Sequence, residues 1–263
     1  MKIAFSKYQG TGNDFILLDN RDERYSVLRA SDVEFLCNRR FGIGADGLIL
    51  LEKKAGYDFE MKYFNSDGNV SSMCGNGGRC ITAFANSLHL INGVAKFIAI
   101  DGEHQSLIED NKSMIVKLKM GDVKGCEIVG DDIFLNTGSP HYVKFVKDVM
   151  DVDVVAEGRK IRYNDRFIQE GTNVNFVTPA AGGLSVRSYE RGVEDETLSC
   201  GTGVTASVLA SVIKGIIKQD AGFCEVKSMG GMLKVFFEKA GEGFINVWLE
   251  GEAKFVYAGE IEI

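Results

Sequence analysis

Short hydrophobic runs rich in β-branched and aromatic residues recur along the whole chain, and most are bounded by Gly, Asn or Asp. Runs with this composition and these boundaries are typical of β-strands. The pattern predicts strands over residues 2–7, 15–19, 48–52, 58–64, 95–100, 115–119, 173–177, 184–189, 233–238 and 244–249. Most of the fold is therefore expected to be β-sheet.

Helical patterns are fewer than strand patterns. Residues 31–34 read as a capping box that begins a short helix ending near Arg39, and residues 152–169 contain a second helical pattern. Two more helices are predicted over about residues 76–90 and 202–217, and both are apolar on almost every face. A helix with so little polar surface is normally buried on all sides, which in this chain means that sheet surrounds it.

The two apolar helices mark similar halves, because about half of the chain length separates them. We therefore expect an α+β fold of two pseudo-symmetric domains, each a mostly antiparallel sheet wrapped around a central helix. Residues 1–118 are expected to form the N-terminal domain and residues 119–252 the C-terminal domain. The last strand, at about residues 253–263, is expected to return to the N-terminal domain.

Composition and charge narrow the class of protein. The 263 residues are 45% hydrophobic, which is enough for a full core, and the formal net charge is −7. No run of Lys or Arg is longer than two, so the expected partner is a small molecule, with no nucleic acid and no membrane. The first residues contain no signal-peptide core, and no stretch reaches the roughly 18 apolar residues of a membrane span. We therefore expect a cytoplasmic protein with reduced cysteines.

Each apolar helix is preceded by a cysteine in a glycine-rich motif. The motifs are Met73-Cys74-Gly75-Asn76-Gly77-Gly78 and Ser199-Cys200-Gly201-Thr202-Gly203-Val204. The first N–H groups of a helix have no partner within it, so a thiolate there is stabilised and its pKa is expected below the usual value of about 8.5. Glycines leave these N–H groups open to an anionic ligand group. No metal site is expected, because Cys74 and Cys80 are too far apart to be a ligand pair.

Polar segments elsewhere supply further candidate site residues. Asn65 lies in a polar segment before the first cysteine motif, and Glu190-Arg191-Gly192 precedes the second. Residues 10–14 read as a hairpin turn. His141 follows a Gly/Pro loop, and in an enzyme with reactive cysteines it is a candidate proton partner.

Six motifs, taken in order, resemble those of the diaminopimelate epimerase family over nearly the whole chain. They are Gly10-Thr11-Gly12-Asn13-Asp14-Phe15, Gly42-Ile43-Gly44-Ala45-Asp46-Gly47, Phe64-Asn65-Ser66-Asp67-Gly68, Met73-Cys74-Gly75-Asn76-Gly77-Gly78-Arg79-Cys80, Glu190-Arg191-Gly192 and Ser199-Cys200-Gly201-Thr202-Gly203. The resemblance implies interconversion of LL- and meso-diaminopimelate in lysine biosynthesis without a cofactor. It also implies an active site between two pseudo-symmetric domains, and usually a homodimer.

The resemblance implies roles for individual residues as well. Cys74 and Cys200 would be the catalytic acid/base thiols, and His141 and Glu190 would tune their protonation. The residues that line the substrate would be Asn13, Asn65, Gly75, Asn76, Asn173, Glu190, Arg191, Gly201 and Thr202.

Three positions depart from the common pattern of the family. Gly47 stands where many members have glutamine and Ser139 where many have asparagine, so two side-chain amides are missing from the expected pocket. Residues 194–197 contain one residue more than the usual spacing before the second cysteine, which puts the expected geometry around Glu190 in question. None of these departures touches the thiols.

Inversion of a carbon centre by proton transfer needs a base on one face and an acid on the other, and two opposed thiols meet this need. Related proline racemases and hydroxyproline epimerases use the same chemistry on a ring substrate, but residues 10–15 and 190–192 favour diaminopimelate. A cysteine hydrolase with Cys200 as nucleophile and His141 as base is a second alternative, although it leaves Cys74 without a role. A non-catalytic amino-acid binder is the third, and it would need no paired thiols.

Overall fold

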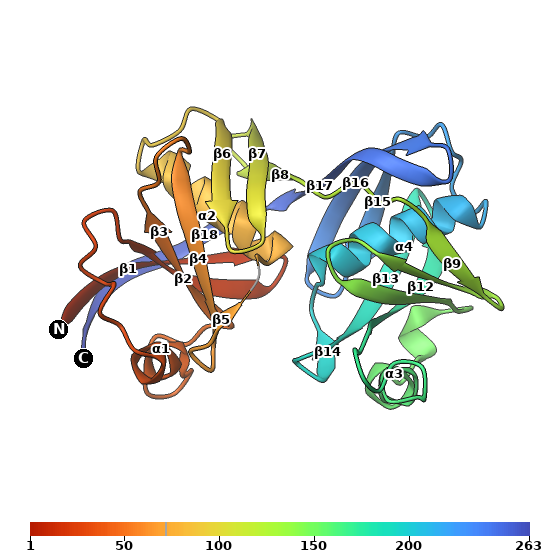
Figure 1. The fold of residues 1–263 in the computed structure, drawn as a ribbon, viewed down its shortest axis with the longest axis horizontal. Helices are drawn as coiled ribbons and strands as arrows, with labels where there is room; N and C mark the ends of the chain where they lie inside the picture. Colours follow the sequence, from red (N-terminus) through yellow and green to blue (C-terminus); the bar gives the residue numbers. More distant parts are fainter. Residues whose placement is uncertain (72) are drawn as a thin grey trace. The chain divides into compact units, whose positions relative to one another are not determined.

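The computed structural model describes residues 1–71 and 73–263. Contacts between Cα atoms divide the chain into two compact units, one of Met1–Leu118 with Gly251–Ile263 and one of Lys119–Glu250. Figure 1 shows that each unit is built mainly of strands, with one helix running among them.

The strands are β1 (Lys2–Gly10), β2 (Asn13–Asp19), β3 (Gly47–Glu52), β4 (Phe59–Asn65), β5 (Val70–Ser71), β6 (Val94–Ala99), β7 (Gly102–Asp110), β8 (Ile115–Lys119), β9 (Cys126–Val129), β10 (Asp132–Asn136), β11 (Pro140–Phe145), β12 (Asn173–Ala180), β13 (Gly183–Glu190), β14 (Asp195–Thr197), β15 (Phe223–Ser228), β16 (Gly231–Ala240), β17 (Gly243–Glu252) and β18 (Lys254–Glu262). The helices are α1 (Ala30–Cys37), α2 (Gly75–Ser87), α3 (Val154–Arg162) and α4 (Gly201–Ile213), with a 3₁₀ turn at Val149–Asp151.

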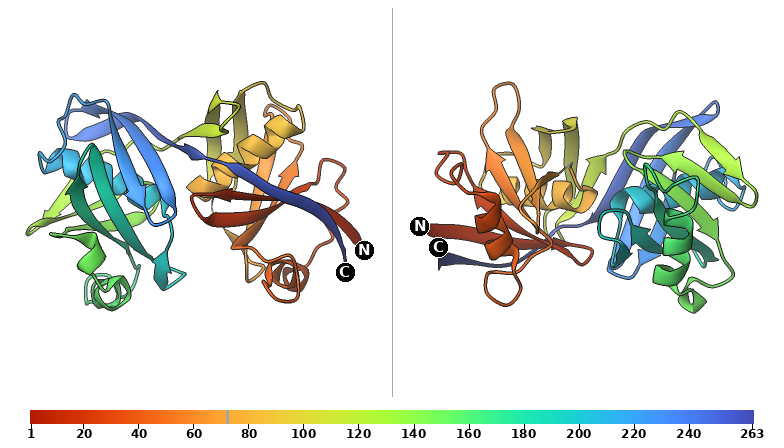
Figure 2. Two further views of the ribbon diagram at one scale, coloured as in Figure 1. Left: turned by 180° about the vertical axis from the view of Figure 1, so that it is seen from behind. Right: turned by 60° about the horizontal axis from the view of Figure 1, so that its bottom comes forward.

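Strand pairing in the first unit is mostly antiparallel. β18 pairs with β1, β1 with β2, β3 with β4, β4 with β5, β6 with β7 and β7 with β8, all antiparallel. The parallel pairs are β2 with β3 and β4 with β6. Because β18 lies along β1, the two chain ends are neighbours, and Ile263 donates its N–H to Met1 O at 3.0 Å (Figure 2).

The second unit repeats this order of pairs. β9 pairs with β10, β10 with β11, β12 with β13, β13 with β14 and β15 with β16 in antiparallel fashion, whereas β11 with β12 and β13 with β15 are parallel. In both units a short helix, α1 or α3, joins the first parallel pair, and a long helix, α2 or α4, joins the second. This repetition confirms the expected α+β fold of two pseudo-symmetric halves.

Sheet surrounds each long helix, as its apolar sequence predicted. Residues 75–85 of α2 are all buried, and the helix contacts β1, β2, β3 and β7. α4 contacts β10, β11, β12, β13, β15 and β16, and nearly all of its side chains are buried. Full burial of one aliphatic side chain contributes about 1.5–3 kcal/mol, so burial on every face fixes both helices firmly.

The helix boundaries differ from the predicted ones. α1 begins at Ala30, and its capping box uses Asp32, which accepts the N–H of Arg29 at 2.9 Å, instead of Glu34. The predicted box was therefore placed two residues too late. α2 ends at Ser87 and α4 at Ile213, earlier than the predicted ends near residues 90 and 217, and Gly215 just after α4 takes a left-handed backbone (φ 74°).

The sequence pattern missed β5, β7, β9, β10, β11, β14 and β15. Several of these strands are short, and the longest, Gly102–Asp110, is mostly polar and buries only two side chains. Such segments form strands because they pair with neighbouring strands, and a local hydrophobic pattern does not show that pairing. Among the described residues, no helix has the length and apolar character needed to cross a membrane.

Candidate active site

Cys74 is the N-cap residue of α2, with an extended backbone (φ −92°, ψ 132°), and the helix begins at the next residue. The glycines that follow bring the helix close to the sheet. A Cβ on Gly77 would lie 3.2 Å from Ile49 Cδ1, and one on Gly78 would lie 3.0 Å from Leu118 Cδ2. Gly77 and Gly78 therefore allow close packing of α2 against its neighbours.

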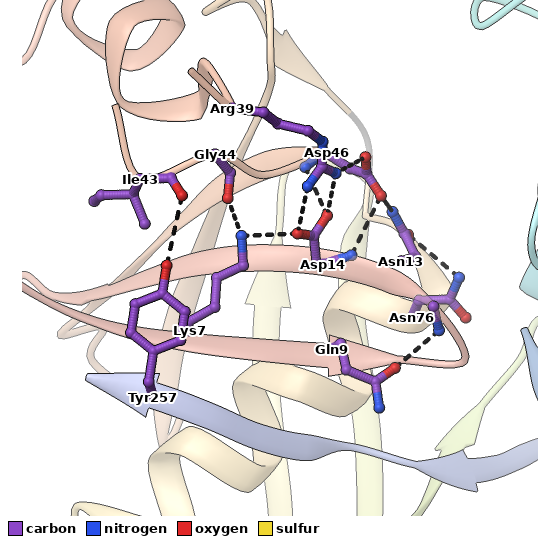
Figure 3. Close-up of polar contacts among 11 residues, drawn as sticks. Lys7, Gln9, Asn13, Asp14, Arg39, Ile43, Gly44, Asp46, Asn76 and Tyr257 are labelled. Carbon is purple, nitrogen blue, oxygen red and sulfur yellow. Dashed lines mark hydrogen bonds and ion pairs between the residues drawn. The ribbon is translucent and has the colours of Figure 1, made fainter. Parts of the chain in front are cut away.

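The predicted residues Asn13 and Asn76 both lie beside Cys74. Asn13 Oδ1 accepts hydrogen bonds from Cys74 Sγ at 3.5 Å and from Asn76 Nδ2 at 3.3 Å. Asn13 Nδ2 donates to Asp46 Oδ2 at 2.6 Å (Figure 3). The structure thus brings together three predicted site residues and adds Asp46, which the sequence had placed only in a motif.

A cluster of charges supports Asp46 and the start of β2. Arg39 Nη2 contacts Asp46 Oδ1 at 2.7 Å and Asp14 Oδ1 at 2.6 Å, and Lys7 Nζ contacts Asp14 Oδ2 at 2.8 Å (Figure 3). Burial raises the pKa of Asp14, but hydrogen bonds and positive charge from Arg39 and Lys7 outweigh it and hold that pKa at about 2. Asp14 is therefore a carboxylate at neutral pH.

Asn65 lies at the same end of the paired strands as Asn13. It ends β4 opposite Gly47 of β3, and Gly47 pairs on its other side with Phe15, two residues after Asn13. A Cβ atom on Gly47 would overlap the ring of Tyr63. The ring of Tyr63 thus takes the space where the family's glutamine side chain would begin, which accounts for glycine at this position.

Arg79 was not among the predicted site residues. It is the one charged residue of α2, and its side chain is fully buried. Its Nη2 donates to Asn76 Oδ1 at 2.9 Å and to Thr11 Oγ1 at 3.2 Å. A single charge in an otherwise apolar helix was the available signal in the sequence.

Cys200 is the N-cap residue of α4 and is only 6% exposed. Its Sγ accepts the N–H of Gly203 at 3.4 Å and lies 3.5 Å from Thr202 Oγ1. Thr137 Oγ1 donates to the carbonyl of Thr202 at 2.9 Å, which ties the predicted loop before His141 to the first turn of the helix. Thr202 therefore lies beside the second thiol.

His141 is fully buried in β11. Its Nδ1 lies 3.0 Å from Asn175 Nδ2, and Asn175 Oδ1 accepts from Ser188 Oγ at 2.9 Å. Burial, with a smaller effect from the positive charge of Arg191, lowers the pKa of His141 to about 3. The imidazole is therefore neutral at pH 7, and among the described residues its buried Nε2 has no hydrogen-bond partner.

Asn173 holds the segment that carries Arg191. Its Nδ2 donates to Ser139 Oγ at 2.9 Å, and its Oδ1 accepts the backbone N–H of Arg191 at 2.9 Å. The guanidinium of Arg191 donates to the carbonyl of Glu170 at 2.7 Å and is solvent-exposed. Ser139, which replaces the family's asparagine, thus still takes part in the hydrogen bonds of this segment.

The additional residue before Cys200 leaves Glu190 in a regular strand. Glu194 takes a left-handed backbone (φ 59°), and its N–H bonds to Glu190 O at 2.7 Å, which closes the turn between β13 and β14. The Glu194 carboxylate accepts from Tyr189 Oη at 3.0 Å and pairs with Arg162 Nε at 3.3 Å. Glu190 itself accepts a hydrogen bond from Thr197 Oγ1.

The other cysteines differ from this pair in placement. Burial raises the pKa of Cys37 and of Cys80 to about 12 and that of Cys224 to about 11, while Cys126 is exposed. Cys80 is thus a core residue. None of these four is an N-cap residue of a described helix.

Comparison with known proteins identifies the family. A model of the diaminopimelate epimerase family matches residues 5–125 and 133–256. A diaminopimelate epimerase of Flavobacterium psychrophilum is 50% identical over 252 residues, which is 95% of this chain and 97% of the relative. Those of Chlorobaculum tepidum, covering 97% of this chain and 99% of the relative, and Aquifex aeolicus, covering 98% of each, are 41% and 38% identical.

The chain belongs to the diaminopimelate epimerase family. This membership confirms the resemblance seen in the motifs and, with it, an isomerase that interconverts LL- and meso-diaminopimelate in lysine biosynthesis.

Solved structures support the fold. A PhzF-family protein of Bacillus anthracis aligns with a TM-score of 0.75 at 14% identity, over all of both chains. A hydroxyproline epimerase of Agrobacterium vitis aligns with a TM-score of 0.69 at 14% identity, covering 99% of this chain and 92% of the other.

Proposed function

We propose that Cys74 and Cys200 are the two acid/base groups of this epimerase. The observation that carries the proposal is that each is the N-cap residue of one of the two buried helices at equivalent places in the repeated fold. One thiol acts as thiolate and removes the α-proton, and the other, as thiol, delivers a proton to the opposite face. The roles exchange when the reaction runs in reverse.

The carbanion formed between the two transfers needs stabilisation, because an α-hydrogen is far less acidic than a thiol. The first N–H groups of α2 and α4, at Gly75, Asn76, Gly201 and Thr202, supply it by donating to the α-carboxylate. One such preorganised donor contributes roughly 3–4 kcal/mol in a site from which water is excluded. The buried helices hold these donors rigid, so little reorganisation accompanies the proton transfer.

Polar side chains bind the rest of the substrate. We assign this role to Asn13, Asn65, Asn173, Glu190 and Arg191. A cationic guanidinium and a carboxylate at neighbouring positions suit the carboxylate and ammonium groups of an amino acid. Asn173 contributes by holding the Arg191 backbone in place.

His141 and Glu190 adjust the protonation of the thiols. His141 acts as a neutral group, through Asn175, whose side chain packs against Gly203 in the first turn of α4. Glu190 contributes a carboxylate that is fixed by Thr197. The buried, neutral His141 is unsuited to be the base of a cysteine hydrolase, because its Nδ1 is bonded to Asn175 and its pKa is about 3.

The two compact units are, in this proposal, the two epimerase domains, with boundaries near residues 118 and 252. The protein acts in the cytoplasm as a homodimer, without a cofactor. Phe255, Val256 and Tyr257 support the dimer, because they form an exposed apolar stretch on β18. Light scattering coupled to size exclusion, at two protein concentrations, tests the dimer, and a monomer at both concentrations contradicts it.

Solvent exchange tests the reaction. In D2O, the enzyme given LL-diaminopimelate is expected to form the meso isomer with deuterium at one α-carbon, and to leave L-proline unchanged in a parallel reaction. Deuterium arrives because the acid thiol has exchanged its proton with solvent. Meso product that contains no deuterium at early times would count against two separate acid/base groups.

A further inference from the structure

Arg79 is a buried cation without a carboxylate partner. Its side chain has 0% exposure, and no ion pair joins it to Asp or Glu within residues 1–71 and 73–263. Its Nε is buried without a hydrogen-bond partner. Burial of a charge in this way is costly, so the remaining hydrogen bonds of the guanidinium should matter to the molecule.

Those hydrogen bonds begin a chain of side chains that ends at Asp46. Arg79 Nη2 donates to Asn76 Oδ1 at 2.9 Å, Asn76 Nδ2 donates to Asn13 Oδ1 at 3.3 Å, and Asn13 Nδ2 donates to Asp46 Oδ2 at 2.6 Å. Figure 3 shows the part from Asn76 to Asp46. Every link is a donor facing an acceptor.

The two ends of this chain fix the orientation of both amides. A guanidinium can only donate and a carboxylate can only accept, whereas an amide presents oxygen on one side and NH2 on the other. Asn76 must therefore turn its oxygen to Arg79, and Asn13 must turn its NH2 to Asp46. Consequently an oxygen, and not an NH2 group, faces Cys74 Sγ at 3.5 Å.

We propose that Arg79 and Asp46 are positioning residues that keep the carbonyl oxygen of Asn13 facing Cys74 and so favour the protonated thiol at that position. Both residues act on Cys74 through the amides of Asn76 and Asn13. The effect on the protonation of Cys74 does not depend on its proposed catalytic role. Its consequence for the reaction does rest on that role: Cys74 would be the protonated thiol, and so the acid, in the free enzyme. Asp46 is held for its task by Arg39.

Arg79 also holds the hairpin that presents Asn13. Thr11, in the turn between β1 and β2, has a left-handed backbone (φ 51°), which is unfavourable for a β-branched residue. Its Oγ1 accepts from Arg79 Nη2 at 3.2 Å. Strain of this kind persists only where the surroundings impose it, and here the buried guanidinium contributes to that.

Other charged and titratable groups surround Cys74 within the first unit, and the test must separate their effect. They are Arg79 and Cys80 of α2, Lys7, Asp14, Arg39 and Asp46 near β2, and Asp101 beyond β6. Removal of any negative charge among them favours the thiolate by a direct Coulomb effect. A control variant must therefore remove a charge without freeing the Asn13 amide.

Asp46→Asn and Asp14→Asn form such a pair. Both remove one negative charge bound to Arg39, but only the Asp46 side chain accepts from the Asn13 side chain. In the full-length protein, iodoacetamide labelling of Cys74 is followed by mass spectrometry from about pH 5 to about pH 10. We expect the midpoint to move down by about one pH unit in Asp46→Asn, because the new amide lets Asn13 turn its NH2 to the thiol. In Asp14→Asn the shift should be less than half as large.

Equal shifts in the two variants, or no shift in Asp46→Asn, would overturn the proposal. The labelling does not depend on turnover, so its result stands even if Cys74 proves to have no catalytic role. Loss of the proposed function is detected separately, by the activity of a Cys74 variant.

A double-mutant cycle tests the link between the two ends. Arg79→Lys retains the charge but not the two-pronged donor, and it should lower kcat roughly tenfold. Arg79 and Asp46 belong to one chain of hydrogen bonds, so breaking either end disturbs the same amides. The fold-losses in kcat of the two single variants should therefore not multiply in the double variant. We expect the double variant to lose less than the product of the single losses. Fully multiplicative losses would show that the two residues act independently. If Arg79→Lys does not fold, the labelling comparison alone decides.

Discussion

Asn175 Oδ1 occupies the space that a Cβ atom on Gly203 would need. The same oxygen accepts a hydrogen bond from Ser188, and the Asn175 amide nitrogen contacts His141. A missing side chain in the first turn of α4 therefore makes room for the buried polar residues behind Cys200. Gly203 of the second cysteine motif is thus required by packing next to the thiol.

Gly203→Ala should disturb this arrangement. The added methyl group meets Asn175 Oδ1 and lies 3.1 Å from Cys200 Sγ, so Asn175 must move and the thiol is displaced. We expect a loss of about 1–3 kcal/mol in the free energy of unfolding and a roughly tenfold to hundredfold loss in kcat. Chemical denaturation and steady-state kinetics measure both. Gly125→Ala is the control, because open space surrounds that position, and equal behaviour of the two variants would contradict the packing argument.

Replacing either thiol should abolish epimerisation. Cys74→Ala and Cys200→Ala each remove one acid/base group, so kcat should fall by roughly 10³-fold or more while the fold is retained. Product formation is followed by chiral separation of the diaminopimelate isomers. Cys126→Ser, a change at an exposed cysteine, should leave kcat unchanged. Substantial activity in either alanine variant would disprove the assignment of that residue.

Acid should destabilise the protein through His141. Its pKa in the folded state, about 3, lies below the value of about 6.5 in the unfolded chain, so the unfolded state binds the proton first as the pH falls. The stability present above pH 6.5 is thus lost progressively toward pH 3, by up to about 1.4 kcal/mol per pH unit. His141→Gln should show a smaller slope between about pH 6.5 and about pH 4 in urea denaturation. Identical slopes would mean that His141 is protonated in the folded protein.

The stability of the turn between β13 and β14 should depend on both the backbone conformation and the side chain of Glu194. Glu194→Ala loses the bond from Tyr189 and keeps the unfavourable left-handed backbone, so we expect a cost of about 1–2 kcal/mol in unfolding free energy. Glu194→Gly loses the same bond but adopts that backbone without strain, so it should be the more stable of the two variants. Denaturant titration of both proteins compares them. Greater stability of the alanine variant would show that the backbone carries no strain.

The local hydrophobic pattern was sufficient to predict the elements whose own side chains are mostly apolar. The strand at Ile115–Lys119 was predicted with its observed boundaries, and both apolar helices were found within a few residues. β11 was missed although it pairs with the distant strand β12, and β14 was missed because it is only three residues long and is a strand through its pairing with β13. The capping box of α1 was misplaced, since Asp32 and Glu34 both offer a carboxylate, and only the backbone geometry selects one.

The amino-acid sequence by itself determined the two thiol motifs, the two buried helices, the repeated fold and the family, because each follows from residue types at fixed spacing. Only the tertiary structure showed that Gly77, Gly78 and Gly203 serve packing, that His141 is buried and neutral, and that Tyr63 fills the space beside Gly47. It alone also connected Arg79 to Asp46 through two amides. The reason is physical: burial, hydrogen-bond direction and close contact depend on atoms that are far apart in the chain and meet only after folding.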